Sequence, residues 1–441
     1  MYLMHAFIGR FDLQVPLTTV LVAAAAVVAA SFGLIYLIPG RAERRDDDHG
    51  AVPRVAVMAL QTVALLYIAF LIAVGIFGNQ ATVLNAATIL FWVITLPVLP
   101  LLHCLVGGMY EVANPFALVA RLITSGASAR KRAGPRLESL GYWPAVILLF
   151  LLFWCELALR VVPNSPRTLG ILVLLYAAFQ VGMGAWLGEG WFRGGDVFQA
   201  MTTLASTVAA LAMHRDEEGF VRWRTGFHPA RFLPEGRGRE ALITLWLAGV
   251  LADGVRVTPI WTFVTDHTGF LNSFPQVGDV APGDLLLDTA EILFTWAAFV
   301  AFFLVFTRLA AVLSRRSPRQ LATIVAPSLI PIALAYLLAH NLTQLIVLGP
   351  LVFTPSDPAA AQRAISISSH SVAPSTVFWI QVVAIVMGHV LAVIMAHARL
   401  ARVEKDSSMA IRADLGWLSA MLIYTATSLW VLAQPITNSS G

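Results

Sequence analysis

Repeated apolar runs of about 20 residues are the feature that most constrains the fold of this chain. Runs of that length are typical of transmembrane helices, whereas the strands of a membrane β-barrel alternate apolar and polar residues with period two. The 441 residues are 58% hydrophobic and only 12% charged, which is about half the charged fraction of soluble proteins. The sequence therefore predicts an all-α, polytopic membrane helical bundle that forms a single integral membrane domain over residues 1–441.

Ten spans are predicted from these runs, and the basic residues between them predict the sidedness. The spans cover approximately residues 16–38, 56–77, 82–107, 142–162, 167–187, 241–262, 285–313, 322–348, 373–397 and 414–434. Most Lys and Arg residues lie in the loops 40–55, 108–141, 214–240, 314–320 and 398–413. Because basic residues are enriched in cytoplasmic loops, these five loops are predicted to be cytoplasmic and both termini to lie outside.

Two further segments, about 114–126 and 196–213, are predicted to be amphipathic helices at the cytoplasmic face. Asn114 and Asp196 are suited to cap their N-termini. Each segment reads Asx-x-Phe, then a short helix, then a basic loop, which indicates a weak internal repeat. If 196–213 crossed the membrane instead, the chain would have eleven spans and every later loop would change side.

Polar residues in the outer third of the span 322–348 point to a functional site. His340, Asn341, Thr343 and Gln344 lie in an otherwise apolar stretch. Hydrocarbon offers such groups no water, so each needs a protein partner or a wet cavity. On a helix, His340 and Gln344 are one turn apart on one face with Asn341 beside them. The alternative is an interhelical hydrogen-bond network without chemistry.

Ionisable residues of three other spans are predicted to share this depth. Counting the helical rise from the outer ends of their spans puts Asp253, Glu291, Glu156 and His340 roughly 9–13 Å below the outer surface. Histidine with carboxylates suits a divalent metal such as zinc, which could activate a water, and it equally suits a proton relay. His340, Glu291 and Asp253 are therefore the predicted catalytic residues and the candidate metal ligands.

Substrate binding is assigned to the polar neighbours Asn341, Gln344 and Gln381, the last of which lies at the same predicted depth. For Glu156 the alternative role is to snorkel to the outer interface beside Arg160. The loops 263–284 and 349–372 could form a lid over an outward-opening cavity, or be ordinary connections.

Three more histidines are interpreted structurally. His103 and His389 are expected to be buried, neutral and hydrogen-bonded across helices, and His397 to anchor the inner interface. Cys104 and Cys155 both fall in apolar runs, so no disulfide framework is predicted. The pI of 9.3 does not indicate nucleic-acid binding, because the basic residues lie at membrane edges.

Several segments keep one order over most of the chain and carry a family resemblance. They are HAFIGRFDLQVP (5–16), NPF (114–116), GGDVF (194–198), ADGVRVTPIW (252–261), PIALAYLLAHNLTQLIVLGP (331–350), WIQVVAIVMGHVLAVIMAHARL (379–400) and IYTATSLWVLAQ (423–434). Together they resemble the fenitrothion hydrolase-like family of bacterial integral membrane proteins. Members usually have an aromatic residue after the histidine, where this chain has Asn341.

The resemblance implies hydrolysis of an organophosphorus triester, with release of a phenol, in the bacterial cytoplasmic (inner) membrane. It also implies a lipophilic small-molecule substrate and a second, similar membrane subunit as a partner. It transfers no catalytic residue to this chain, so the site above rests on the residues alone. Two other functions remain open: a cation- or proton-coupled transporter, and a non-catalytic subunit of a membrane complex.

Overall fold

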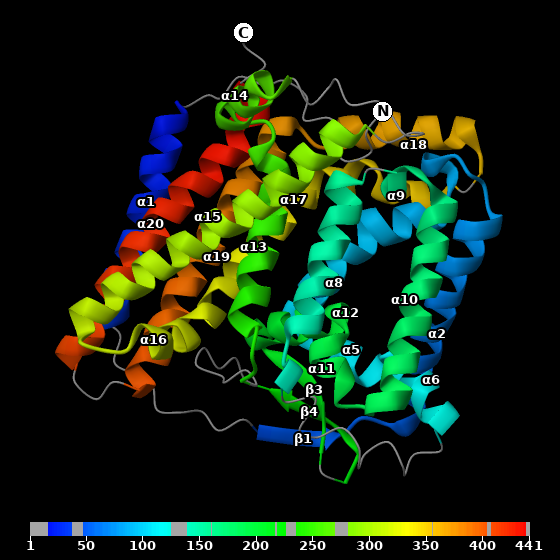
Figure 1. Ribbon diagram of the computed structural model, residues 1–441, viewed down its shortest axis with the longest axis horizontal. Coiled ribbons are helices and arrows are strands. Elements are labelled where there is room, and N and C mark those ends of the chain that lie inside the picture. The colour runs from blue at the N-terminus through cyan, green and yellow to red at the C-terminus, as the bar shows by residue number, and fades with distance from the viewer. Residues whose placement is uncertain are drawn as a thin grey trace.

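Long apolar helices dominate the computed structural model, which describes residues 16–37, 47–124, 139–159, 161–216, 218–225, 235–269, 281–354, 356–403 and 407–437 (Figure 1). Eight helices in these residues are long and apolar enough to cross a membrane. Six of them are unbroken: α1 (Leu17–Leu37), α2 (Arg54–Phe77), α10 (Pro166–Leu187), α15 (Pro282–Ser314), α19 (Pro374–Val403) and α20 (Ser407–Thr437). The predicted polytopic helical protein is therefore confirmed at this level.

The other two long helices change their winding along their length. One consists of α3 (Ala86–Thr88), the π-helix η3 (Ile89–Thr95) and α4 (Leu96–Leu105). The other consists of α16 (Pro318–Val325), the 3₁₀ segment η7 (Ala326–Leu329) and α17 (Ile330–Val347). Pro327 and Pro331 lack the N–H groups that would continue an α-helical ladder, which explains the change at η7.

Two predicted spans depart from a single long helix. The span 142–162 is a shorter apolar helix made of α8 (Trp143–Phe153) and the π-helix η4 (Trp154–Ala158). The span 241–262 is wrong as one helix, because α13 (Arg239–Val255) and α14 (Pro259–His267) meet at an angle of 73°. Pro259 cannot donate to the carbonyl of Val255, and Thr258 instead caps the start of α14.

Short elements gather at the two ends of the bundle. The loop 349–372, predicted as a connection or lid, contains the 14-residue helix α18, and 270–280 of the other predicted lid lie outside the described residues. Figure 1 shows α9, α14 and α18 at one end and α6, α11 and α16 at the other. Their bounds are η2 (Thr82–Leu84), α5 (Met109–Ala113), α6 (Pro115–Thr124), α9 (Val161–Asn164), α11 (Trp191–Gly195), α12 (Val197–Ala205), η5 (Ser206–Val208), η8 (Gly349–Phe353) and α18 (Pro358–Ser371).

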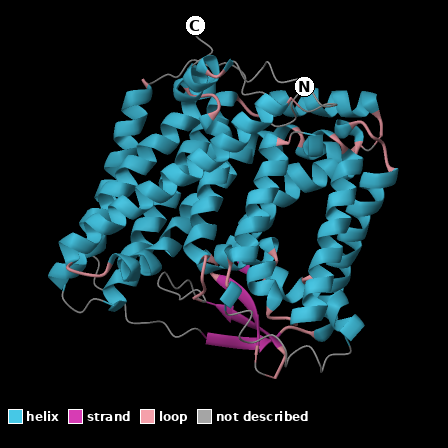
Figure 2. Ribbon diagram, in the orientation of Figure 1, coloured by secondary structure: helices cyan, strands magenta, loops and turns pink. Residues whose placement is uncertain are grey.

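A small four-stranded sheet, which was not predicted from the sequence, accompanies the helical bundle. Its order is β1-β4-β3-β2, antiparallel except for the β2–β3 pair, and it lies at the end opposite α14 (Figure 2). The strands are β1 (Asp47–Ala51), β2 (Val106–Gly107), β3 (Leu211–Arg215) and β4 (Val221–Thr225). In the β3–β4 hairpin, the hydrogen bond from Arg222 Nε to Asp216 Oδ2 at 2.6 Å holds the pKa of Asp216 below its usual value. The strands are too short for their pattern to stand out among apolar runs.

The predicted surface helix at 196–213 is also corrected. It ends at Ala205, and its end continues into η5 and then strand β3. A nine-residue helix rises only about 14 Å, so α12 is too short for the membrane crossing that the eleven-span alternative requires. Most of its residues are buried inside the protein, including both Met201 and Thr202. Two polar side chains of this helix are satisfied inside the protein, because Thr202 bonds to the helix backbone and Gln199 accepts from Asn114.

The two predicted N-caps are confirmed and touch each other. Asn114 Oδ1 accepts from the first amides of α6, and Asp196 Oδ1 accepts from those of α12. Asn114 Nδ2 then donates to Asp196 Oδ2 at 2.9 Å, while the hydroxyls of Tyr110 and Tyr176 donate to the same carboxylate. Both caps are therefore part of one buried network that joins the two short helices.

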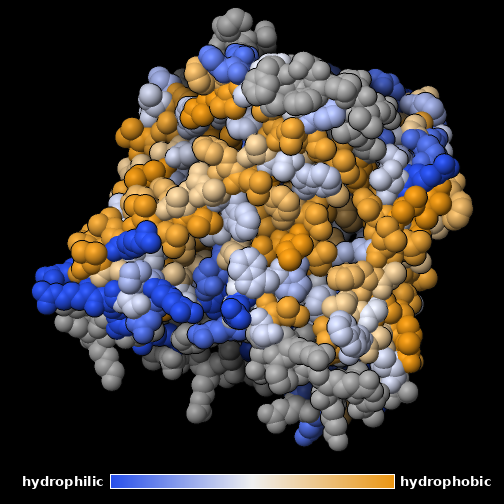
Figure 3. All heavy atoms as spheres, viewed as in Figure 1, coloured by the Kyte–Doolittle hydropathy of each residue, from blue (hydrophilic) through white to orange (hydrophobic). Residues whose placement is uncertain are grey.

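Helix α13 is the centre of the larger core cluster. Every residue from Leu242 to Asp253 is buried, and α8, α15, α17 and α20 pack around it. Figure 3 shows apolar residues in a broad band across one face of the molecule, with hydrophilic residues gathered along an edge. An apolar band of this kind is suited to face lipid. Because α13 is buried, the polar residue Asp253 in its last turn lies in the protein interior.

Candidate functional site

The structure brings His340 of α17 against Asp253 of α13. His340 Nε2 lies 3.0 Å from Asp253 Oδ2, which is hydrogen-bonding distance. Asp253 lies in the last turn of the buried helix α13, so its side chain is only 6% exposed, whereas that of His340 is 27% exposed. The ring of Tyr336, one turn earlier, is stacked near the imidazole with centroids 6.2 Å apart. These contacts orient the imidazole.

His340 differs from other histidines in the described helices. In His103, His267, His370 and His389, Nδ1 lies within 2.9 Å of the carbonyl oxygen four residues earlier. No described residue forms a hydrogen bond with Nδ1 of His340, whose other nitrogen faces a carboxylate. When Asp253 is ionised it accepts from Nε2–H, so the Nδ1 of a neutral His340 carries a lone pair.

A small cavity adjoins this pair. Its volume is about 50 Å³, and its wall includes Asp253, His340, Asn341, Glu156 and Trp246. A water needs roughly 10–15 Å³ of such volume, so the cavity has room for a few waters. Drug-sized ligands occupy roughly 300–1,000 Å³, so this cavity cannot enclose one in the present conformation.

Two π-helical turns shape the same wall. Trp92 lies in η3 and Glu156 in η4, and both side chains line the cavity. The wider winding is visible in the backbone, where Leu159 N donates to Trp154 O five residues earlier at 2.8 Å. Such π-bulges re-aim side chains and are frequent at functional sites. Proline supplies part of the cause, because Pro97 in the turn after η3 has no N–H to donate.

Glu156 therefore does not take the snorkelling role. It lines the interior cavity and is close enough to Asp253 and Arg256 for their charges to interact. Its expected neighbour Arg160 lies outside the described residues.

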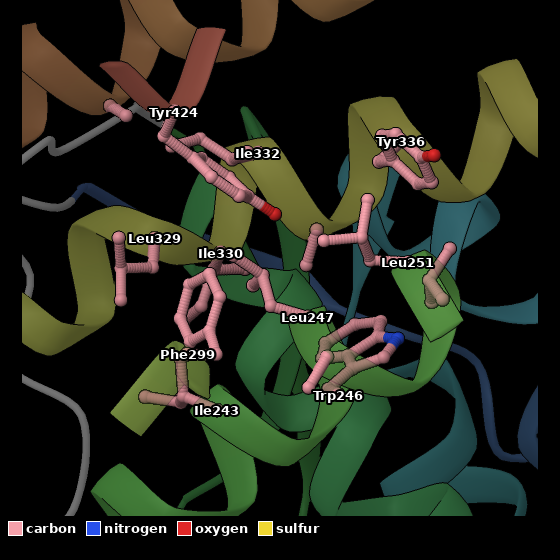
Figure 4. Packing of buried hydrophobic residues seen from close by; sticks show 14 of the residues in the cluster. Ile243, Trp246, Leu247, Leu251, Phe299, Leu329, Ile330, Ile332, Tyr336 and Tyr424 are labelled. Atoms are coloured by element: carbon pink, nitrogen blue, oxygen red, sulfur yellow. The ribbon is translucent and has the colours of Figure 1, made fainter. Parts of the chain in front are cut away.

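Two indole N–H groups in the cavity wall have no acceptor among the described residues. They belong to Trp92, which is 7% exposed, and Trp246, which is fully buried. In Figure 4 the nitrogen of Trp246 lies at the end of the ring turned away from Leu247 and Phe299. A buried donor without a partner costs about 1–3 kcal/mol, so an acceptor placed near these groups is stabilised.

Glu291 corrects the predicted triad. Instead of meeting His340, its carboxylate binds Arg256 Nε at 2.6 Å. Asp288, one turn earlier on α15, lies 3.4 Å from Arg256 Nη2. All three side chains are mostly buried, and Glu291 is close enough to Asp253 for their negative charges to interact. The charge cluster of Arg256, Asp288 and Glu291 therefore neighbours the His340–Asp253 pair.

The sequence reasoning missed Arg256 and Asp288 as partners. No role for Arg256 is predicted from the sequence, although this residue follows Asp253 by three positions. Asp288 precedes Glu291 by three positions on one helix face, a spacing that signals a shared partner.

The residues present do not fit the suggested zinc site. Within the described part of the chain, no group of three or more His, Cys, Asp and Glu side chains is arranged to hold a metal ion. A catalytic zinc needs about three protein ligands, and the guanidinium of Arg256 already occupies Glu291. Within the described residues, the donor set His340, Glu291 and Asp253 is therefore not assembled.

The three residues predicted to bind substrate do not line one common cavity. Asn341 lines the cavity beside His340, and its Nδ2 donates to Leu337 O at 2.9 Å. Gln344 is not part of that wall. Gln381 is buried and donates from Nε2 to Ala339 O at 2.7 Å, and it lines a different cavity.

The remaining histidines are bound more locally than expected. His103 is buried, with Nδ1 near Leu99 O and Nε2 accepting from the amide of Tyr110, which fixes a neutral tautomer. His389 is buried but bonds to Ile385 of its own helix rather than across helices. His397 pairs with Asp414 of α20, Nδ1 to Oδ2 at 2.7 Å, and so joins two helices.

Comparison of the sequence with known protein families and with curated proteins, and of the fold with solved structures, returned no match.

Proposed function

We propose that this chain is a membrane-embedded hydrolase in which His340, oriented by Asp253, acts as a general base on a water in the cavity. The observation that carries the proposal is the His340–Asp253 contact at 3.0 Å beside a water-sized cavity. A base held by a carboxylate, with its second nitrogen free, is the arrangement that activates water in many hydrolases. The substrate class, a neutral lipophilic organophosphorus triester, comes from the family resemblance.

The residues account for each proton in such a reaction. Nδ1 of His340 takes a proton from water as the water oxygen bonds to phosphorus, and the phosphorus–aryloxy bond breaks. Asp253 holds Nε2–H and stabilises the imidazolium that forms. The leaving phenolate receives the proton from imidazolium or solvent, so the products are a phosphorus diester and a phenol.

Access to the pair is proposed to come from the lipid side. The cavity of about 50 Å³ can hold the attacking water but not the triester. The side chain of His340 is 27% exposed, so a substrate dissolved in the bilayer can approach the imidazole from outside the cavity.

Hydrolysis in water enriched in ¹⁸O tests the proposal. Purified protein in lipid vesicles should release nitrophenol from a nitrophenyl phosphotriester, with the ¹⁸O label in the phosphorus diester only. Protein-free vesicles give the background rate. No release above that background, or label in the phenol, contradicts the proposal.

Proton or cation transport is the second candidate, and one observation favours it. The charge cluster of Arg256, Asp288 and Glu291 carries ionisable groups from the cavity into the α13–α15 interface. Buried acids in membrane helices often form proton relays. Proton flux into vesicles that is lost in Glu291→Gln, without nitrophenol release, supports transport over hydrolysis. Neither activity is expected of a non-catalytic subunit.

A further inference from the structure

A second, larger cavity lies between α17, α18 and α19. Its volume is about 450 Å³, within the range of roughly 300–1,000 Å³ that ligand sites occupy. It is separate from the His340 cavity, and none of the residues that line one lines the other. Thr343, three residues after His340, lies in its wall.

The wall is neutral and amphipathic. Its described lining contains no Asp, Glu, Lys or Arg. The apolar members are Ile346, Val347, Ile365, Val372, Pro374 and Val377, and the polar members are Thr343, Gln362, Ser366, Ser368, Ser369, His370 and Gln381. A charged ligand would find no counter-charge in this lining, so the wall suits a neutral molecule with an apolar body and a hydrogen-bonding end.

Thr343 presents a hydroxyl that the helix does not use. Many helical threonines of this chain donate to the carbonyl four residues earlier, as Thr62, Thr124, Thr307 and Thr425 do. The corresponding carbonyl for Thr343 is that of Ala339, which accepts from Gln381 Nε2 at 2.7 Å. Thr343 Oγ1 is buried and has no partner among the described residues.

Gln381 presents the complementary acceptor. Its Nε2 is engaged by Ala339 O, and no described residue donates to its Oε1. Since the residue is only 2% exposed in the wall of the cavity, an acceptor here calls for a ligand that donates a hydrogen bond. An ester has no such donor, whereas a hydroxyl group can donate to Gln381 and accept from Thr343.

We infer that this cavity is a binding site for a neutral phenol or an alcohol of similar size. The hydroxyl donates to Gln381 Oε1 and accepts from Thr343 Oγ1, and the ring packs against the apolar members of the wall. The identification of this ligand with the phenol released at His340 rests on the proposed function, while the cavity and its two groups stand without it. Gln381 also holds the carbonyl of Ala339, the residue before His340, so the two sites share one helical turn.

Matched ligands test the inference. Binding of 4-methylphenol and of 4-methylanisole, which lacks the donor, is measured by calorimetry on protein in lipid nanodiscs, with empty nanodiscs subtracted. One neutral hydrogen bond changes affinity by roughly threefold to tenfold, so the phenol should bind tighter by that factor. Thr343→Val should weaken phenol binding by a similar factor, and Gln381→Met should remove the preference for the phenol. Thr376→Val, at an exposed position on α19, is the control and should bind like the unchanged protein.

Equal affinity for the two ligands, or wild-type affinity in both Thr343→Val and Gln381→Met, overturns the inference. The assay contains no ester, so it is independent of hydrolysis. Hydrolysis without a preference for the phenol rules out this binding site but leaves the proposed function intact. A preference for the phenol without hydrolysis supports the binding site and contradicts the proposed function.

Discussion

Replacing Asp253 with Asn is expected to lower nitrophenol release by about 10²- to 10⁴-fold. Asn is close to Asp in size but cannot stabilise an imidazolium, and its amide can hold His340 in the wrong tautomer. The effect should lie in the rate of the chemical step, because Asp253 contacts the imidazole and is 6% exposed. The measurement is initial-rate release from a nitrophenyl phosphotriester by protein in vesicles.

The control for Asp253→Asn is Asp284→Asn. Asp284 is an exposed acid in the first turn of α15, so removing its charge leaves the cavity unchanged. Release in Asp284→Asn should stay within about twofold of the original, since exposed substitutions rarely change a distant site. If Asp253→Asn releases nitrophenol as fast as Asp284→Asn, the carboxylate does not orient the base.

Replacing Arg256 with Met is expected to destabilise the fold by about 3–5 kcal/mol. The guanidinium is the observed partner of Glu291 at 2.6 Å and lies 3.4 Å from Asp288. Its loss leaves two buried carboxylates whose side chains are 0% and 6% exposed, and breaking one side of a buried ion pair is strongly destabilising. Thermal unfolding in detergent, followed by circular dichroism, should show a clearly lower midpoint.

A double substitution identifies the cause of that loss. Adding Glu291→Gln to Arg256→Met removes one of the stranded charges, so the combined loss should be smaller than the sum of the two single losses. Arg308→Met, at an exposed arginine of α15, should leave the midpoint nearly unchanged. Additive losses, or an equal effect at Arg308, contradict the account of the charge cluster.

Long-range hydropathy made most of the fold predictable. The predicted spans 56–77 and 167–187 differ from helices α2 and α10 by only a few residues, because lipid requires an unbroken apolar helix of sufficient length. Helical depth predicted that His340 and Asp253 lie at one level, and the structure shows that these two side chains are in contact.

The predicted depth of a residue in the membrane could not show which residues at that depth contact each other. Glu291 shares the layer with His340 but binds Arg256, because an opposite charge at the broken end of α13 competes more strongly for a carboxylate than a neutral imidazole does. Rotation about each helix axis decides which side chains meet, and it depends on packing between distant segments. For the same reason, the sequence could not predict the cavity lined by Thr343 and Gln381, because these residues lie on two different helices.

Short elements escaped prediction for a different reason. The sequence of α12 alternates apolar and polar faces as a membrane-surface helix would, yet its polar face is satisfied by Asn114 and by its own backbone. Amphipathicity shows that two environments exist, but it does not tell whether the polar one is water or protein. The strands of the sheet are at most five residues long, too short to produce a period-two signal.

Release of nitrophenol by His340→Ala, with and without added imidazole, tests the central claim most directly. If His340 Nδ1 is the base that activates water, the variant should lose about 10²- to 10⁴-fold in rate, and free imidazole should restore part of it. His267→Ala, at a histidine of α14 bonded only within its own helix, should change neither rate. Undiminished release by His340→Ala would contradict the assignment of the base.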